Sequence, residues 1–190
     1  MPTKLPTDDV IDSANKLFES HAADVGRVAL SWNTLHDALG ELFAEVISPD
    51  GRSVALAAWQ AVQSDRSKRK MLDGVSVAAL GSDAKFTQEV KWANGQLNAL
   101  EDNRNDAVHS PYSVLIEDGA LKVVPYVFAG SVRARKLQGK NLELELRSYS
   151  TNMDRLRDFA RGLLGKSLSP ASDPSWPERP KLPRLAQATA

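Results

Sequence analysis

The sequence predicts a mainly α-helical protein with a small antiparallel β-hairpin appendage and a C-terminal helix. Three observations carry this prediction. Apolar residues recur at steps of three and four over much of the first 110 residues, which is the spacing of one helix face. Alternating segments around an Asp-Gly pair follow at residues 113–126 and are typical of a hairpin. Helical spacing returns over residues 151–166.

Composition narrows the class of protein. The chain has 190 residues, enough for one domain with a hydrophobic core, and its 24 Lys and Arg residues balance its 24 Asp and Glu residues. Because the total charge is neutral, binding to nucleic acid or to an anionic membrane would have to come from local patches. The sequence contains no cysteine, which excludes disulfides, thiolate metal sites and cysteine nucleophiles.

The sequence indicates a cytoplasmic protein that does not contact a membrane. Residues 1–16 lack the apolar region of a secretory signal. No apolar run approaches the roughly 18 residues that a spanning helix needs. Three histidines, at positions 21, 36 and 109, show no metal-binding spacing, so we expect no metal site and no cofactor.

Two helices are expected between residue 7 and the Asp-Gly turn at 50–51. Thr7 and Asp8 can cap the start of the first, and His21 is expected at a helix junction. A long helix should follow, with His36 as a partly buried helix residue rather than a metal ligand. A Pro-Asp-Gly sequence at 49–51 ends it. One apolar seam runs along this helix and comprises Val25, Val28, Trp32, Leu35, Leu39, Leu42 and Val46.

Residues 53–80 are compatible with two further helices, of which Ser64 and Asp65 can cap the second. Another long helix should follow and end near His109, because Pro111 disfavours helical backbone at the residue before it. Its apolar seam comprises Phe86, Val90, Ala93, Leu97 and Leu100.

Two hairpins are expected after this helix. The first turns at the Asp-Gly pair at 118–119, a favoured two-residue turn. The second is expected within residues 131–150, where leucines alternate with charged residues as in a half-buried strand. The alternating residues are Leu142, Leu144 and Leu146.

The remaining chain should form a helix and a tail. The helix should start at Thr151 with a capping-box variant. Residues 167–190 are rich in Pro and Ser, so we expect an extended or disordered, loosely held tail, although Trp176 could dock on the body or on a partner. The chain then divides into a helical bundle (1–110), β-hairpins with the C-terminal helix packed on the bundle (111–168) and a tail (169–190). The buried face of the last helix should comprise Met153, Leu156, Phe159 and Leu163.

The stretch Glu101–Tyr112 interrupts the apolar pattern. Arg104 stands where a Leu or Ile would continue the seam, and a charge there is costly unless it is paired or the seam opens into a cleft or interface. His109 lies about 140° further round an ideal helix. The two side chains could act on one substrate if the helix distorts before Pro111, or if a second subunit supplies the other half of the site.

The segment RNDAVH at 104–109 resembles the R-x4-6-H motif of the HEPN superfamily. Members of this superfamily are helical bundles that dimerise with their motifs facing each other across the two-fold axis. Many are metal-independent ribonucleases in toxin–antitoxin, phage-defence or RNA-processing systems. The resemblance covers about Asp8 to Ser110 and implies an HEPN-like helical bundle and a homodimer. Many toxin members have a tyrosine two residues after the histidine, where this chain has Pro111, followed by Tyr112.

The resemblance implies three catalytic residues. Arg104 would stabilise charge on the phosphate, and His109 would transfer a proton near neutral pH. Asn105 would orient the phosphate or the imidazole, and Asp106 could do likewise beside the substrate. The 2′-hydroxyl of the RNA could be the nucleophile, so this chemistry needs no metal.

Two basic runs are candidate RNA contacts. Residues 65–70 (DRSKRK) lie on an expected helix, and residues 133–140 (RARKLQGK) lie on the expected second hairpin. A solvated face is the simpler interpretation of each run. As RNA contacts, the residues of the second run would offset the neutral total charge; they are Arg133, Arg135, Lys136 and Lys140.

Three functions are compatible with the sequence. The first is a metal-independent endoribonuclease that acts on RNA as a homodimer, as a toxin or phage-defence effector with an antitoxin or another protein partner. The second is a non-catalytic HEPN-like module that binds RNA, a nucleotide or a protein. The third is a structural helical protein. In that case Arg104 would pair with Glu101 or with a carboxylate on a neighbouring helix, and His109 would simply favour the negative helix end.

Overall fold

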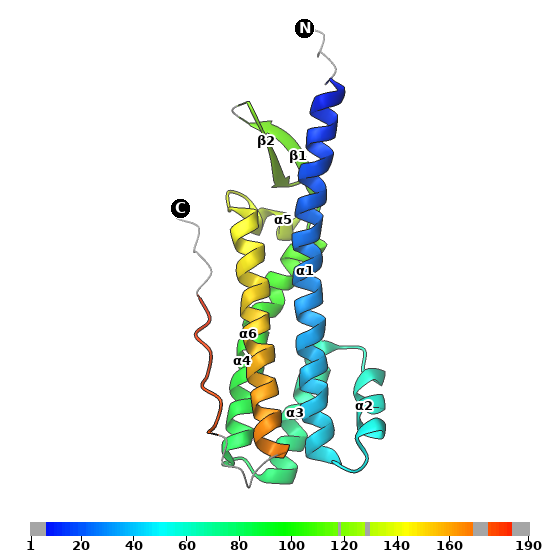
Figure 1. Ribbon diagram of the computed structural model, residues 1–190, viewed down its shortest axis with the longest axis vertical. Coiled ribbons are helices and arrows are strands. Elements are labelled where there is room, and N and C mark those ends of the chain that lie inside the picture. The colour runs from blue at the N-terminus through cyan, green and yellow to red at the C-terminus, as the bar shows by residue number, and fades with distance from the viewer. Residues whose placement is uncertain (1–6, 118, 128–129, 169–174, 184–190) are drawn as a thin grey trace. The chain divides into compact units, whose positions relative to one another are not determined.

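The computed structural model describes residues 7–117, 119–127, 130–168 and 175–183, and these form a mainly α-helical protein (Figure 1). The predicted fold class is confirmed at this level: helices dominate, and one antiparallel hairpin precedes a C-terminal helix. None of the described helices is long and apolar enough to cross a membrane. The elements are α1 (Asp8–Ile47), α2 (Arg52–Ala61), α3 (Asp65–Leu80), α4 (Lys85–His109), β1 (Tyr112–Glu117), β2 (Ala120–Pro125), α5 (Val132–Leu137) and α6 (Leu142–Leu168).

The chain forms two compact units. The described part of unit 1 consists of the start of α1, the end of α4, the hairpin, α5 and the start of α6, within residues 7–29 and 103–149. Unit 2 takes the rest of those three long helices together with α2 and α3, within residues 30–102 and 150–183. Each unit therefore combines segments that are far apart in the sequence.

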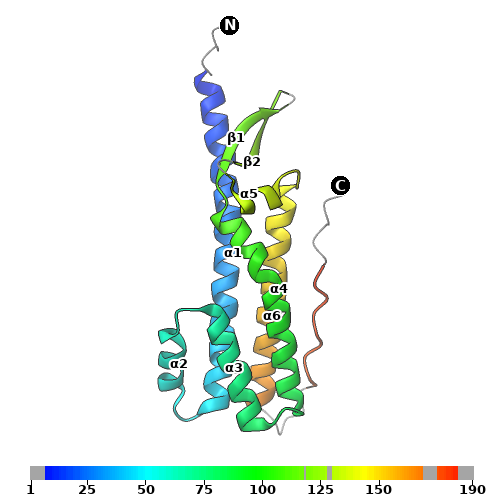
Figure 2. The same cartoon turned by 180° about the vertical axis from the view of Figure 1, so that it is seen from behind.

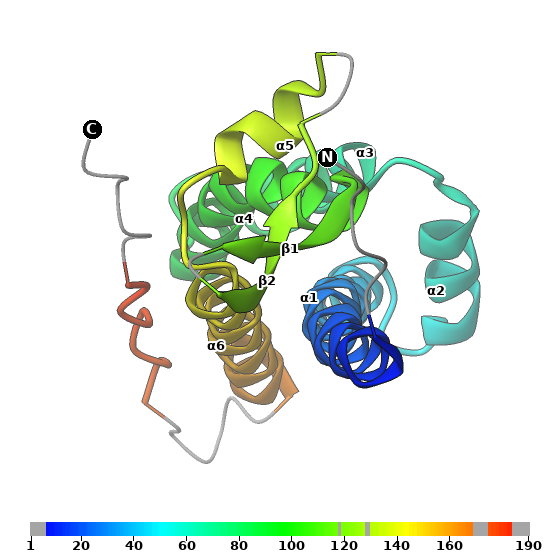
Figure 3. The same cartoon turned by 90° about the horizontal axis from the view of Figure 1, so that it is seen from above.

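The core of unit 2 begins with the predicted seam of α1. Trp32, Leu35 and Leu39 are fully buried, as their helical spacing predicts. Helix α2 lies beside this part of α1, on the side away from α6 (Figure 3). Gly40 allows this approach, because a Cβ atom there would lie 2.8 Å from Nε1 of the buried Trp59.

Helices α3 and α4 run side by side in unit 2 (Figure 2). The predicted cap is confirmed, since Ser64 Oγ accepts a hydrogen bond from the backbone N–H of Ser67. Helix α4 ends at His109, also as predicted. Its apolar seam is buried at Phe86, Val90, Ala93, Leu97 and Leu100.

The first predicted hairpin is confirmed in unit 1. Strands β1 and β2 pair in antiparallel register from Tyr112 opposite Pro125 to Glu117 opposite Ala120. Gly119 has φ of 79°, which suits glycine in a tight turn. Asp118, the other residue of the predicted turn, lies outside the described residues.

The second predicted hairpin is wrong, because residues 132–137 and 142–168 are helices. Leu142 and Leu146 are buried, whereas Leu144 is 59% exposed, so the leucines follow the helical period rather than the strand period. Asn141 Oδ1 accepts a hydrogen bond from the Leu144 backbone and starts the helix there, nine residues before the expected start at Thr151.

This segment is a helix rather than a strand because its helical spacing of buried residues continues beyond the leucines. Tyr149 and Met153 extend the buried face that Leu142 and Leu146 begin, whereas strand alternation covers only three leucines. The junction expected at His21 is also wrong, since α1 passes through that residue without interruption.

The expectation of a loosely held tail is wrong for residues 175–183, which we call the strap. Arg179 Nε donates a 2.7 Å hydrogen bond to Glu89 of α4, and its guanidinium lies 5.2 Å from the ring centre of Trp92. The backbone carbonyls of Lys181 and Pro183 accept hydrogen bonds from two side chains of α6, namely Arg155 and Asn152. The strap has no helix or strand, but it lies along unit 2 (Figure 1). Residues 169–174 and 184–190 of the predicted tail lie outside the described residues.

Candidate functional site

The RNDAVH motif forms the last turns of α4, in unit 1. Arg104 is half-buried, and its Nη1 donates a 2.9 Å hydrogen bond to Asn105 Oδ1. His109 is the final helical residue and is exposed. Because α4 stays α-helical up to His109, no distortion of the helix brings His109 to Arg104. The route that depends on a distorted helix is therefore not seen in this chain, and the route that uses a second subunit stays a prediction.

Asp106 connects the motif to α5. Its side chain is buried, and its oxygens lie 3.3 Å from Lys136 Nζ and 3.9 Å from Arg133 Nη1. The structure therefore brings two of the predicted RNA contacts to the motif, while Arg135 on the same helix is exposed. Asp106 itself faces these cations from a buried position. Lys140, just beyond α5, pairs with Glu145.

Tyr112 closes the end of the motif helix. Its hydroxyl donates a 2.8 Å hydrogen bond to the Ala107 carbonyl, one of the carbonyls that a helix end leaves without a partner. Burial, with a smaller effect of Asp106, raises the pKa of Tyr112 to about 12. Its ring meets the His21 ring edge-on, with centres 4.3 Å apart. Tyr112 is thus a neutral structural residue at physiological pH.

A second polar cluster lies in unit 2 and centres on Arg69, which is only 2% exposed. Its guanidinium donates to Glu101 at 2.7 Å and to Asn98 at 3.0 Å, and it lies 5.6 Å from the ring centre of Trp32. The interpretation of residues 65–70 as a solvated face is therefore wrong at Arg69. The helical spacing of Arg69, Leu72 and Ser76 places Arg69 on the same face as two buried residues, but it does not identify the partners that allow a charge to be buried there.

His36 completes the Arg69 cluster, and its hydrogen bonds fix its proton. Its Nδ1 lies 3.0 Å from the Trp32 carbonyl, which only accepts, so Nδ1 carries the hydrogen. Its Nε2 lies 3.2 Å from Arg69 Nη1, which only donates, so Nε2 is unprotonated. Burial lowers the pKa of His36 in agreement with this neutral form. Predicted as a partly buried helix residue, His36 is only 5% exposed.

The chain matches no family model, and comparisons with curated proteins and with solved structures find no match. The resemblance to the HEPN superfamily therefore rests on the motif and on its place at the end of a long helix. Among the described residues, no group of three or more His, Asp or Glu side chains is arranged to hold a metal ion.

Proposed function

We propose that this protein is a metal-independent endoribonuclease of the HEPN type that works as a homodimer and serves as a toxin or phage-defence effector. The observation that carries the proposal is the end of α4. There Asn105 holds the Arg104 guanidinium, His109 is exposed at the helix end, and Asp106 pairs with two cations of α5.

The proposed reaction is an attack of the RNA 2′-hydroxyl on the adjacent phosphorus. One histidine removes the 2′-proton, and a second donates a proton to the departing 5′-oxygen, which leaves a 2′,3′-cyclic phosphate and a 5′-hydroxyl. Arg104 binds the non-bridging oxygens as their charge increases. Each chain contributes one His109, so a dimer supplies both the base and the acid.

The electrostatics of unit 1 support RNA binding near the motif. An unpaired aspartate there would repel a phosphate, but Asp106 is buried against Lys136 and Arg133. Both cations remain about half exposed, so a phosphate in the solvent can approach their charged groups. With Arg135, they provide a local basic patch on a chain of neutral total charge.

Exposed apolar side chains of unit 1 offer candidate positions for the proposed dimer interface, because interfaces bury such side chains. The exposed apolar residues of this unit include Ile11, Phe18, Leu115, Ile116, Tyr126, Val127 and Val132.

Cleavage of a mixed RNA substrate tests the proposal. His109→Ala should slow cleavage by about 10²–10⁴-fold, because proton transfer by a positioned side chain contributes about that factor. Arg104→Ala should also abolish most activity, while a chelator should have no effect. Arg27→Ala is the matched control, since it removes an exposed cation of unit 1 outside the motif and should leave the rate unchanged. Full activity of His109→Ala would place the chemistry on another residue.

The alternative is a non-catalytic module that binds RNA, a nucleotide or a protein. It is favoured by the separation of His109 from Arg104 within one chain, since a lone subunit offers a cation and no adjacent proton carrier. A wild-type protein that binds RNA through Arg104 but releases no cyclic phosphate would establish this alternative.

A further inference from the structure

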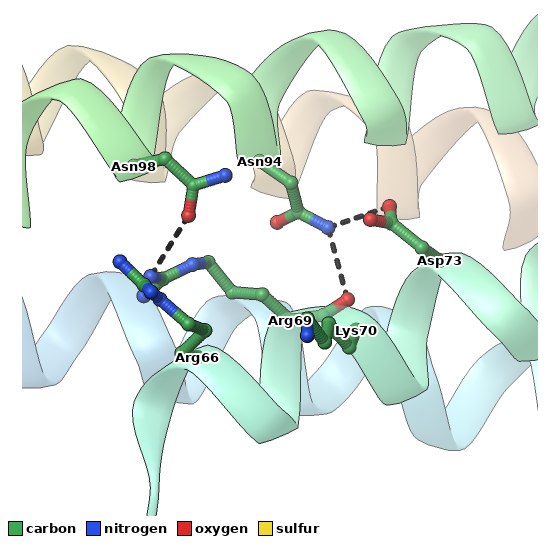
Figure 4. A pocket seen from close by; sticks show the side chains of 6 residues that line it. All are labelled: Arg66, Arg69, Lys70, Asp73, Asn94 and Asn98. Atoms are coloured by element: carbon green, nitrogen blue, oxygen red, sulfur yellow. Dashed lines mark hydrogen bonds between the residues drawn. The ribbon is translucent and has the colours of Figure 1, made fainter.

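Unit 2 contains a cavity of about 300 Å³ between α3 and α4 (Figure 4). A volume of this size lies at the lower end of small-molecule sites. The residues that line it come from two turns of α3 and one turn of α4, and all six are polar or charged: Arg66, Arg69, Lys70, Asp73, Asn94 and Asn98.

A buried acceptor without a partner lines this cavity. Asn94 is almost fully buried, and its Nδ2 donates to the Arg69 carbonyl at 3.2 Å and to Asp73 Oδ1 at 2.8 Å. Both partners only accept, so the amide cannot be flipped and Oδ1 must point the other way. That oxygen has no hydrogen-bond partner, although leaving a buried acceptor unpaired is costly.

A donor faces the same gap. Asn98 Oδ1 accepts a 3.0 Å hydrogen bond from Arg69, which fixes that amide as well. Its nitrogen consequently points away from Arg69, and in Figure 4 it is directed towards Asn94, whose oxygen points back. Arg69 Nε is a further buried donor without a partner. An acceptor and a donor side by side match the edge of an amide or of a nucleobase.

Charge gives the cavity two different ends. Arg66, which is 64% exposed and pairs with Glu101 at 3.5 Å, lies at the end near Asn98, and Asp73 lies beside Asn94 at the other end. Arg66 and Asp73 are seven positions apart on the helix, which is about 10 Å along the axis. Lys70, between them on α3, adds a second exposed cation. An anionic group would therefore bind towards Arg66 and Lys70, away from the Asp73 carboxylate.

We propose that this cavity binds a small organic phosphate with an amide-like edge, such as a nucleoside monophosphate. Asn94 Oδ1 and Asn98 Nδ2 would pair with the edge, and Arg66 and Lys70 would contact the phosphate. Arg69 would hold both asparagines in place, since its guanidinium binds Asn98 and its backbone carbonyl binds Asn94. This site lies in unit 2, so it is independent of the RNDAVH motif of unit 1 and of the ribonuclease proposal.

Isothermal titration calorimetry of the full chain tests the proposal with four compounds for each base: the nucleoside monophosphate, the nucleoside, ribose 5-phosphate and inorganic phosphate. At least one monophosphate should bind at least 10-fold more tightly than each of its three fragments, because it alone offers both the edge and the phosphate. If ribose 5-phosphate binds as tightly as the monophosphate, the cavity is only an anion site. If no compound binds at millimolar concentration, the cavity is not a binding site for these compounds. Either result overturns the proposal.

Variants locate the binding and separate it from catalysis. Arg66→Ala and Lys70→Ala should each weaken the monophosphate about 10-fold and leave nucleoside binding unchanged. Lys68→Ala is the matched control, since Lys68 lies on the same helix outside the cavity. Unchanged monophosphate affinity in both Arg66→Ala and Lys70→Ala would overturn the assignment. His109→Ala should bind as the wild type does, even if it has lost all ribonuclease activity.

Discussion

Arg69 is a buried cation whose burial cost is met by specific partners. A charged group away from water is tolerated only when it is paired and hydrogen-bonded. Here the guanidinium reaches a carboxylate, an amide oxygen and an imidazole nitrogen, and it lies over an indole ring. These partners lie on α1 and α4, whereas Arg69 lies on α3, so one side chain connects three helices of unit 2.

Removing this cation should destabilise the protein strongly. Arg69→Ala should lower the free energy of unfolding by about 3 kcal/mol, the lower end for breaking a buried pair, because Glu101 keeps some access to water. Urea denaturation followed by circular dichroism measures the loss. Arg66→Ala is the control, since Arg66 pairs with the same carboxylate from an exposed position and should cost less than about 1 kcal/mol. Equal losses in both variants would show that burial is not the cause.

His36 should make stability depend on pH. Burial lowers its pKa, and Arg69 and Lys68 act in the same direction against Asp65 and the hydrogen bond to the Trp32 carbonyl. The unfolded chain protonates this histidine near pH 6.5, whereas the folded chain does so only at lower pH. The free energy of unfolding should therefore fall as the pH drops below about 6.5, until the folded pKa is passed.

Denaturation at a series of pH values measures this loss. His36→Gln should flatten the curve between pH 7 and pH 5. Some slope should remain in His36→Gln, since burial also lowers the pKa of His21 against the opposing effect of Asp24. A His36→Gln curve identical to the wild type would contradict the neutral tautomer.

At the scale of elements, the strap shows how a segment without helix or strand is held in place. Glu89 is buried and binds both Arg179 of the strap and Lys85 of its own helix. Burial alone would raise the pKa of Glu89, but these two cations outweigh it and the net pKa lies below the ordinary value. The strap thus neutralises a buried carboxylate of α4, which explains why it does not behave as a loose tail.

Two glycines of α6 test the fit of the strap. A Cβ atom at Gly162 would lie 2.9 Å from Pro177 Cβ, so Gly162→Ala should push the strap away and increase its cleavage by a protease. Gly165 has no atom within 4 Å of such a Cβ atom. Gly165→Ala should raise the free energy of unfolding by up to about 1 kcal/mol through helix propensity and leave the cleavage rate unchanged. Equal protease sensitivity in the two variants would contradict the contact.

At the scale of the whole molecule, the proposed activity requires two chains. Light scattering at tens of micromolar should report twice the chain mass, because an interface worth about 8 kcal/mol holds at such concentrations. Ile116→Glu, at a 66% exposed position of unit 1, should yield a folded monomer without ribonuclease activity. Leu30→Glu, at a 63% exposed position of unit 2, should remain dimeric and active. A wild-type monomer that cleaves RNA would refute the composite site.

The sequence alone determined four features through local patterns. They are the helices with long apolar seams, the first hairpin, the cap at Ser64 and the end of α4. Periodicity, capping and proline act within a few residues of chain, so these features do not depend on distant partners. The sequence also singled out the RNDAVH motif. The prediction from the sequence failed at residues 131–150. Three alternating leucines there fit the pattern of a strand as well as that of a helix, and only the buried Tyr149 and Met153 distinguish the two patterns.

Only the tertiary structure decided which charged residues are buried. Arg69 and Lys70 are neighbours in one basic run, yet the first faces Glu101, Asn98 and His36 while the second is exposed. Asp106 likewise finds its cations in a helix that follows about 30 residues later, and Glu89 finds Arg179 90 residues away. A charge can be buried only where a distant segment supplies its partner, and local sequence does not contain that information.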